Sequence, residues 1–437
     1  MLRLGRPTTV DIETPERGTL APAVGRRQPT WWPRDLYYGW VLVVALGLTT
    51  IISYGTTYYL FGVLVVPVGH DLGWSRADIS GAYALGTVLA GLLGVPIGRA
   101  VDRHGARLLM AAGSALGGCS LLGLSAVHAL WQFYLLWAGG LGVATALTFY
   151  PVTFTIVANW FARRRGRALA LLTLLGGLAS PIFIPLAGAL VLHLGWRTTL
   201  MVLGLLQLGI ALPVHAIVVR RHPEDLGLHP DGAHPASDAN ASQLSGQTLH
   251  AALRQLPFWT LTGAFSLTLL ATNVVLVHAV AYLISRGYDG AAAASIVGAV
   301  GLASLPGRFL LNLLSDRIGP QLLLSLCLAT QAVGVLLLVH GASLGWLIAY
   351  VVVYGAAFGA VSPLKAAVMA SHFGRRAYGS ITAVQGVPVA LCAGVGPVVA
   401  GWLYDRFASY QLPFSLCVGA FVLAAVSVAL TPRPASS

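Results

Sequence analysis

Charged residues are scarce in this sequence. Only 9% of its 437 residues are Asp, Glu, Lys or Arg, whereas 57% are hydrophobic; an ordinary soluble domain has about 25% charged residues. A water-soluble fold of this length would need far more polar side chains to cover its core. The shortage excludes a soluble enzyme, a nucleic-acid-binding domain and a disordered protein. The composition is typical of a protein that crosses the lipid bilayer many times.

Lysine and cysteine are also rare. The 26 cationic residues include a single lysine, Lys365, and the others are arginine. The four cysteines are far apart, each inside an apolar run, so neither the ligand spacing of a metal site nor a disulfide framework is visible. The sequence also has no nucleotide-binding loop and no catalytic set of residues in one soluble segment. We therefore expect a protein that is not an enzyme and that has no metal and no bound cofactor.

The positive charges are concentrated in a few places. The formal net charge is +12 at neutral pH, but the arginines form short clusters between apolar runs or lie in the first 37 residues. Such clusters follow the positive-inside rule, so they set the orientation in the membrane and do not indicate a nucleic acid as partner. The clearest clusters are Arg99–Arg107, Arg163–Arg167, Arg220–Arg221 and Arg375–Arg376.

Twelve apolar segments, each long enough to cross the bilayer as a helix, follow the first 37 residues. Residues 222–257 are rich in Pro, Asp, His, Ser and Gln and divide these segments into two sets of six. We predict a disordered tail over 1–37, a six-helix unit over 38–221, a linker over 222–257, a second six-helix unit over 258–431 and a tail over 432–437. The predicted spans are 38–66, 77–98, 107–127, 131–158, 167–192, 197–219, 258–284, 291–314, 320–340, 344–371, 379–403 and 411–431.

The loops differ in charge according to their position. Loops after even-numbered segments carry the arginine clusters, whereas loops after odd-numbered segments carry little charge. Because cytoplasmic loops are enriched in Arg and Lys, we expect both termini and the central linker to be cytoplasmic. The sequence thus predicts a multi-pass protein of the cell (inner) membrane, with the lipid bilayer as its surroundings.

The two halves repeat each other. Asp102–Gly105 follows the second segment, and the similar Asp316–Gly319 follows the eighth, 214 residues later. Phe161–Arg164 and Phe373–Arg376 form a second pair, 212 residues apart. Two matches at nearly one offset indicate duplication of a six-helix unit, although arginine-rich loops can also resemble each other through topology alone. We predict an all-α membrane protein with twelve transmembrane helices in two bundles of six, related by a pseudo-two-fold axis.

The loop after the second segment carries a known motif. Gly98–Arg107 resembles the signature loop of the major facilitator superfamily, and a degenerate copy follows the eighth segment. The resemblance implies a transport fold in which this loop takes part in gating. Its carboxylates, Asp102 and Asp316, can pair with arginines such as Arg103 and Arg317 or cap helix ends, and so latch the bundles in one state.

Further segments resemble the monocarboxylate transporter-like branch of that superfamily, which includes the oxalate/formate antiporter group. The resemblance extends over nearly everything from residue 38 to about residue 431, and it implies transport of an organic anion. The segments that carry it are Tyr38–Trp40, Gly73–Arg76, Trp160–Phe161, Arg165–Gly166, Arg221–Gly227, Tyr378–Ser380, Gly396–Pro397 and Tyr404–Asp405.

Two fixed charges lie well inside the predicted helices, Arg308 in the eighth and Lys365 in the tenth. An ionisable residue inside the bilayer indicates function by default. Counting back from the loops at 1.5 Å per residue places them about 12 Å and 15 Å from the helix ends, so we expect a similar depth near the midplane. Both could instead snorkel to the headgroups, and Lys365 could bond carbonyls freed near Pro363.

The resemblance gives Arg308 a role. It implies that the eighth and tenth helices line the central cavity and that an arginine of the eighth helix pairs with the substrate carboxylate. Ser304 stands where the family has an acidic residue one turn earlier. That departure puts the usual proton-coupling scheme of the family in doubt.

Titratable acids are missing from the middle of the membrane. All 14 Asp and Glu residues fall in tails, loops or helix ends, which argues against a cationic or drug substrate because such carriers usually hold a carboxylate in the membrane. His278 in the seventh segment is then the best candidate for proton coupling, although it could simply be hydrogen-bonded within the bundle.

Uncharged polar residues could complete a binding pocket. Phenol and amide groups can bind a carboxylate without adding charge, and each could equally join two helices. The candidates are Tyr54, Tyr58, Tyr150, Asn273, Tyr354 and Gln385.

These observations predict a secondary transporter of small organic anions, in particular monocarboxylates. It would work by alternating access, either as a symporter with a proton as the second partner or as an anion exchanger. A dicarboxylate exchanger is the alternative that two cations favour. A drug exporter and a non-transporting sensor on the same scaffold also stay open.

Overall fold

The computed structural model describes residues 37–161, 164–232, 247–341, 343–374 and 377–432, and the regular structure in these ranges is helical. Most of the predicted tails and the middle of the predicted linker lie outside the described residues. The helices of the first half are α1 (Tyr38–Tyr54), η1 (Gly55–Tyr59), α2 (Leu60–Leu72), α3 (Arg76–His104), α4 (Ala106–Ser125), α5 (Leu130–Tyr134), η2 (Leu135–Gly142), α6 (Val143–Thr148), α7 (Tyr150–Trp160), α8 (Arg165–Gly176), α9 (Ala179–Leu206), η3 (Gln207–Ala211) and α10 (Leu212–Ile217).

The second half is more regular. Two short 3₁₀ turns, η4 (Pro223–Leu226) and η5 (Pro230–Gly232), precede it. Its helices are α11 (Leu249–Leu253), α12 (Leu256–Ser285), α13 (Gly290–Ile318), α14 (Pro320–His340), α15 (Leu344–Phe373), α16 (Tyr378–Phe407) and α17 (Gln411–Leu430).

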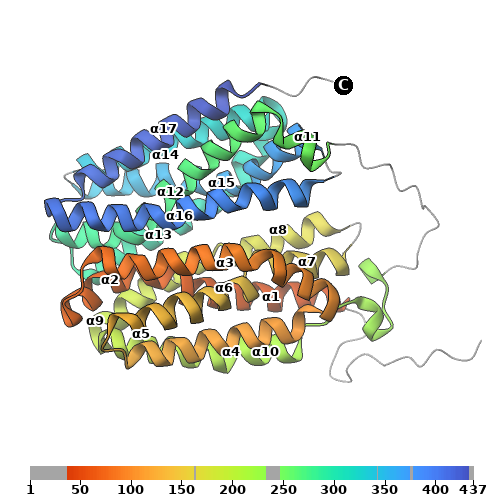
Figure 1. Cartoon of the computed structure of the whole chain (residues 1–437), viewed down its shortest axis with the longest axis horizontal. Helices are drawn as coiled ribbons and strands as arrows, with labels where there is room; N and C mark the ends of the chain where they lie inside the picture. Colours follow the sequence, from red (N-terminus) through yellow and green to blue (C-terminus); the bar gives the residue numbers. More distant parts are fainter. Residues whose placement is uncertain (1–36, 162–163, 233–246, 342, 375–376, 433–437) are drawn as a thin grey trace, which may run out of the picture.

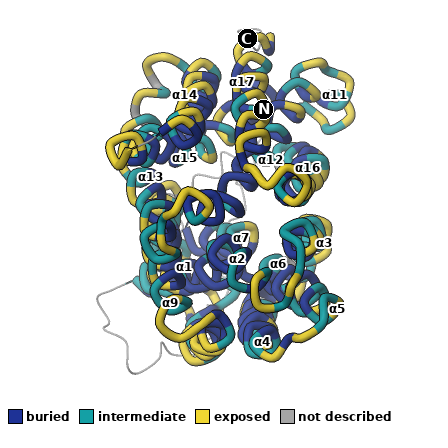
Figure 2. The backbone as a smooth tube through the Cα atoms, turned by 90° about the vertical axis from the view of Figure 1, so that its left-hand side faces the viewer, coloured by how far each residue is buried: buried dark blue, intermediate teal, exposed yellow. Residues whose placement is uncertain are grey.

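The two halves form two bundles that lie side by side. Helices α1–α10 gather in the first bundle and α11–α17 in the second (Figure 1). The view along the bundles shows exposed residues around the outside and buried residues within each bundle and along the seam (Figure 2).

Eleven helical stretches among the described residues are long and apolar enough to cross a membrane. One of them, Gly166–Ile217, has 52 residues, or about 78 Å at 1.5 Å per residue, whereas the hydrocarbon core is about 30 Å thick. Gly195 interrupts it with φ 78° and ψ 162°, a conformation that only glycine adopts readily. The stretch therefore makes two crossings, and the total is the predicted twelve.

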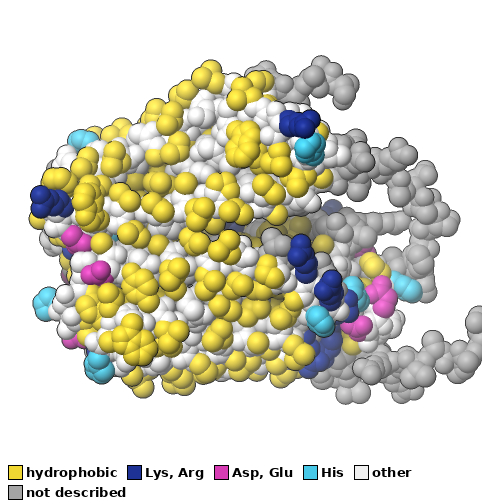
Figure 3. Space-filling model, in the orientation of Figure 1, with side chains coloured by type: hydrophobic (Ala, Val, Ile, Leu, Met, Phe, Trp, Pro, Cys, Tyr) yellow, Lys and Arg dark blue, Asp and Glu magenta, His cyan; other side chains and the backbone are white. Residues whose placement is uncertain are grey.

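The surface fits a bilayer. Hydrophobic side chains cover the middle of the face in Figure 3, and charged side chains gather at its two ends. We call one end the basic end, because the exposed side chains of Arg103, Arg164 and Arg317 lie there. The opposite end carries Asp71 and Asp405, which follow odd-numbered crossings.

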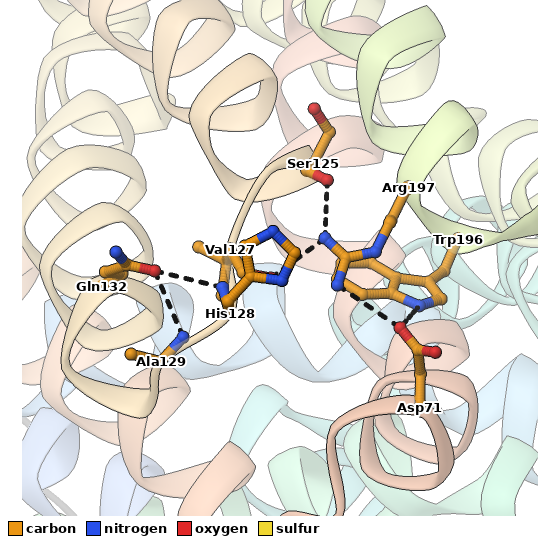
Figure 4. Close-up of polar contacts among 8 residues, drawn as sticks. All are labelled: Asp71, Ser125, Val127, His128, Ala129, Gln132, Trp196 and Arg197. Carbon is orange, nitrogen blue, oxygen red and sulfur yellow. Dashed lines mark hydrogen bonds and ion pairs between the residues drawn. The ribbon is translucent and has the colours of Figure 1, made fainter.

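Arg197 ties together the loops of the first bundle at the opposite end (Figure 4). Its Nη1 donates to the carbonyls of Ser125 and Val127, both at 2.9 Å, and its Nη2 forms an ion pair with Asp71 at 3.4 Å. Trp196 donates to the same carboxylate at 3.1 Å. The turn at Gly195 thus places two side chains that join three loops.

The predicted repeat is visible in the backbone. Gly105 ends α3 with φ 82° and ψ 160°, and Gly319 ends α13 with φ 83° and ψ 143°. These glycines are 214 residues apart, the offset of the two loop motifs. The same unusual backbone at the same offset fits two bundles built from one repeated unit.

Candidate transport site

Arg308 lies at the seam between the bundles. It belongs to α13 of the second bundle, and its Nη1 donates to the carbonyl of Thr173 in α8 of the first bundle at 2.7 Å. The phenol of Tyr150 lies within hydrogen-bonding reach of the same guanidinium. Arg308 is partly exposed. Its charge is thus held where helices from both bundles meet.

A break in the fourth crossing positions Tyr150. Pro151 has no N–H and its ring crowds the preceding turn, so it suits the first turn of a helix better than the interior, and here it lies in the first turn of α7. Helix α6 ends at Thr148, Phe149 is extended with φ −83° and ψ −178°, and α7 begins at Tyr150. Discontinuous membrane helices often mark binding sites, because the break turns side chains and backbone groups toward a cavity.

Lys365 lies elsewhere on the second bundle. It belongs to α15 and is partly exposed, and its Nζ is 4.6 Å from the centre of the Phe265 ring in α12. In the part of the chain that the structure describes, no carboxylate lies within ion-pair distance of this amine. The ring face offers only a weak cation–π attraction, so the amine keeps the capacity to bind an anion.

The two cations are not level, in contrast to the expected similar depth. A Cβ on Gly359 would lie 3.0 Å from the backbone nitrogen of Arg308, so these two positions are adjacent where α13 and α15 cross. Lys365 follows Gly359 by six residues, which is about 9 Å further toward the basic end. Counting from loops missed this offset because it assumes that all helices end at one height.

Two tyrosine side chains and one asparagine side chain connect the bundles. Tyr58 in η1 and Tyr83 in α3 both donate to Oδ1 of Asn273 in α12, at 3.2 Å and 2.7 Å. Asn273 donates in turn to the carbonyl of Leu269 at 2.9 Å. The structure therefore brings the predicted Tyr58 and Asn273 together. Tyr83 was missed, although a tyrosine inside an apolar segment was the signal that selected the others.

Two cavities adjoin Tyr58. The interbundle cavity, about 40 Å³, lies between the bundles and is bordered by residues that include Tyr58, Ser180, Thr272, Val297 and Tyr354. The aromatic cavity, about 240 Å³, lies within the first bundle, and its lining residues are Tyr54, Thr57, Tyr58, Tyr83, Gly86, Thr87, Ala90, Trp137, Leu141, Gly142, Thr145 and Phe149.

The other predicted polar residues fall in different places. Tyr354 borders the interbundle cavity, and its buried hydroxyl has no hydrogen-bond partner among the described residues. Tyr54 borders the aromatic cavity and stacks on Phe149 with ring centres 3.7 Å apart. Gln385 is buried within the second bundle, where it donates to Thr262 at 3.3 Å, and it borders neither cavity.

His278 belongs to a hydrogen-bonded chain at the opposite end. Its Nε2 is 2.9 Å from the carbonyl of Pro397, and its Nδ1 is 3.2 Å from the Tyr410 hydroxyl, which also contacts Nη1 of Arg76. A carbonyl can only accept, so Nε2 carries a proton, and in the neutral ring Nδ1 accepts from Tyr410. The Tyr410 oxygen then accepts from Arg76. Every group has a partner when His278 is neutral.

The same contacts hold the bundles together at that end. Asp405 at the end of α16 accepts from the backbone N–H groups of Arg76 and Ala77, at 3.2 Å and 3.0 Å, which are the first residues of α3. The Arg76 guanidinium lies 3.6 Å from the centre of the Tyr404 ring. A carboxylate of the second bundle thus caps a helix of the first, and we call Arg76, Tyr404, Asp405 and Tyr410 the opposite-end clamp.

The predicted gating loops lie at the basic end. Arg103 and Arg317 are exposed there, whereas the side chains of Asp102 and Asp316 lie outside the described residues. At this end the space-filling view shows a recess between the bundles (Figure 3). The two bundles are therefore joined by the clamp at the opposite end and separated by a recess at the basic end.

Two six-helix bundles that meet around buried polar groups fit a membrane transporter, and comparison with known proteins supports that class. The Major Facilitator Superfamily model matches residues 46–387 and 296–437. Monocarboxylate transporter 13 of Bos taurus is 28% identical over 403 residues, which cover 91% of this chain and 90% of that protein. Monocarboxylate transporter 3 of Rattus norvegicus is 27% identical, with 91% and 81% covered.

Solved structures share the fold. A bacterial homologue of the human lysosomal transporter Spinster, in an inward-facing and unoccupied conformation, superposes with a TM-score of 0.68 at 15% identity, over 92% of this chain and 96% of that chain. The nucleoside transporter NupG superposes with a TM-score of 0.69 at 15% identity, over 90% and 100%.

The chain belongs to the major facilitator superfamily. Within it, the chain is similar to the monocarboxylate transporters. It is therefore a multi-pass membrane transporter, and its family and relatives are transporters rather than enzymes.

Proposed function

We propose that this transporter carries small organic anions, in particular monocarboxylates, by alternating access. The observation that carries the proposal is the pair of cations, Arg308 and Lys365, inside the apolar zone and partly exposed. A charge within the bilayer is costly unless it is paired, and described residues offer Lys365 no carboxylate. A substrate carboxylate is the natural partner. The monocarboxylate transporters among the relatives support the same choice.

In this proposal Arg308 binds the substrate carboxylate. The guanidinium forms a planar fork of donors that matches a carboxylate in a bidentate manner. It also sits where α8, α7 and α13 meet, so an anion bound there contacts both bundles. Lys365, about 9 Å nearer the basic end, attracts the anion as it enters or receives the second carboxylate of a diacid.

The alternation would follow from the two ends of the seam. The opposite-end clamp is formed in this state, whereas the bundles leave a recess between them at the basic end. We place the basic end on the cytoplasmic side of the cell (inner) membrane. In the other state Asp405 would release the start of α3, and the loops with Asp102, Arg103, Asp316 and Arg317 would latch the basic end. Rocking of two rigid bundles around a fixed site needs only such paired contacts.

Proton coupling would use His278. Tyr410 contacts it directly, and Arg76, Tyr282 and Tyr404 surround Tyr410 in turn. Asp405 accepts from the backbone of Arg76. A protonated His278 has two donors, so Nδ1 would point a proton at the oxygen that already accepts from Arg76. Protonation would thus weaken the clamp and favour opening to the outside, as proton symport requires. Anion exchange is the alternative, in which the substrate alone neutralises Arg308.

A thermal-shift screen tests the proposal. Ligands that bind the native state raise its melting temperature by mass action. We expect monocarboxylates to stabilise the purified protein, Arg308→Gln to abolish the shift, and Arg254→Gln, an exposed arginine at the basic end, to leave it unchanged. No shift with any carboxylate, or the same shift in Arg308→Gln, would contradict the proposal.

A further inference from the structure

The aromatic cavity has the size of a ring-binding site. Its volume is about 240 Å³, whereas an apolar protein cavity of about 150 Å³ already binds benzene. A monocarboxylate of two or three carbons would leave most of this space unfilled. The cavity is therefore larger than the smallest substrates of the proposed class require.

The chain builds this cavity with two irregular segments. The π-helical turns η1 and η2 both border it, through Thr57 and Tyr58 on one side and Trp137, Leu141 and Gly142 on the other. A π-helical turn widens a helix locally and is found frequently at functional sites. Gly86 of α3 and Gly142 of η2 also border the cavity, and their backbones are in close contact. A Cβ on Gly142 would lie only 2.9 Å from the Gly86 Cα.

The wall offers aromatic surface and few free donors. The rings of Tyr54, Tyr58, Tyr83, Trp137 and Phe149 all border the cavity. No charged side chain of the described residues borders it, which would suit an uncharged group.

Five of the six hydroxyl groups of the wall, all but that of Tyr54, already donate a hydrogen bond. Thr57, Thr87 and Thr145 donate to helix carbonyls four residues earlier, at 2.6–2.9 Å. Tyr58 and Tyr83 donate to Asn273. Because these hydroxyl protons already form hydrogen bonds, the wall offers a polar ligand few donors. An aryl ring would instead pack against the aromatic faces.

The aromatic cavity lies near the cation of the proposed carboxylate site, although Arg308 itself borders neither cavity. Tyr150, which adjoins Arg308, has its ring centre 5.0 Å from that of Tyr54, and Tyr54 borders the cavity. Tyr58 borders the interbundle cavity as well. A molecule that reaches past Tyr150 and Tyr54 would present a carboxylate to Arg308 and an apolar group to the aromatic cavity.

We infer that the aromatic cavity is a specificity subsite and that the preferred substrates are aryl-substituted monocarboxylates. This inference rests on the proposed function, because it assumes that Arg308 binds the carboxylate. The ring would lie among Tyr54, Trp137 and Phe149, and a linker of a few carbon atoms would pass Tyr150. Tyr58 and Tyr83 would transmit occupancy of the cavity to the second bundle through Asn273.

Competition in proteoliposomes tests the subsite. The assay measures how propanoate and phenylpropanoate inhibit uptake of labelled propanoate. Because apolar contacts in a pocket discriminate by about 10-fold or more, we expect the half-inhibitory concentration of phenylpropanoate to be at least about 10-fold lower. Uptake of labelled propanoate without this difference would overturn the subsite alone. No uptake of labelled propanoate, and none of labelled phenylpropanoate in a parallel assay, would overturn the proposed function as well.

Two variants fill the cavity from different walls. Ala90→Leu adds volume from α3 and Thr145→Phe from α6, and Ala112→Leu is the matched control on the exposed side of α4. We expect both filling variants to cancel the advantage of phenylpropanoate while propanoate uptake persists, and the control to retain it. If either folded variant, with unchanged propanoate uptake, keeps the full advantage, the ring does not occupy this cavity.

Discussion

Replacement of Asp405 by asparagine is expected to loosen the opposite-end clamp. The carboxylate caps the first two N–H groups of α3 across the bundles, at 3.2 Å and 3.0 Å. Asp405 is exposed, and a charge at an exposed helix N-terminus contributes about 0.3–1 kcal/mol. Asparagine keeps the shape and one acceptor but loses the charge. Because these bonds exist only while that end is closed, the change should shift the population toward the outward-open state by about 2–5-fold.

Thiol labelling measures this shift. Thr272→Cys, in a background without the four native cysteines, places a thiol in the interbundle cavity, and an impermeant reagent is added on the side of the opposite end. We expect Asp405→Asn to raise the labelling rate by the same factor. Asp289→Asn is the matched control, because Asp289 caps α13 within its own bundle, with bonds of 3.0 Å and 2.9 Å. Equal rates with and without Asp405→Asn would refute the reasoning.

Three further predictions concern coupling, charge and a turn. His278→Gln should abolish the rise of uptake at acidic outside pH, because glutamine cannot gain a proton against Arg76; an unchanged pH profile of initial rates would exclude this histidine. Lys365→Gln should raise the KM of dicarboxylates more than that of monocarboxylates if the amine receives a second carboxylate, and equal increases would leave it only a general electrostatic role. Gly195→Ala should lower the free energy of unfolding by about 1–3 kcal/mol, since φ is 78° there, and an unchanged melting temperature would contradict that strain.

Much of the fold follows from local sequence signals. Apolar runs of membrane-spanning length define the crossings, and the break between the fifth and sixth occurs at Gly195, inside the predicted gap between 192 and 197. The repeated loop motif has its physical counterpart in Gly105 and Gly319, which share one backbone conformation. Such features depend on a few neighbouring residues, so a sequence contains them.

The site depends on contacts that a sequence does not contain. The residues near Arg308 come from α7 and α8, and Asp405 caps a helix that begins 329 residues earlier. Pairings of this kind arise only when two bundles pack. The π-helical turns at η1 and η2, which open the aromatic cavity, have no recognisable sequence signal. The offset between the two cations also required the crossing of α13 and α15 at Gly359.

The central claim is that Arg308 binds the carboxylate of a transported monocarboxylate, and uptake into proteoliposomes tests it most directly. Labelled phenylpropanoate would be offered to vesicles with the wild-type chain, Arg308→Gln or the control Arg254→Gln, each loaded with the same unlabelled acid. The account predicts saturable uptake by the wild type and the control, and uptake at the level of empty vesicles for Arg308→Gln. Saturable uptake by Arg308→Gln with an unchanged KM, or binding without uptake by the wild type, would contradict it.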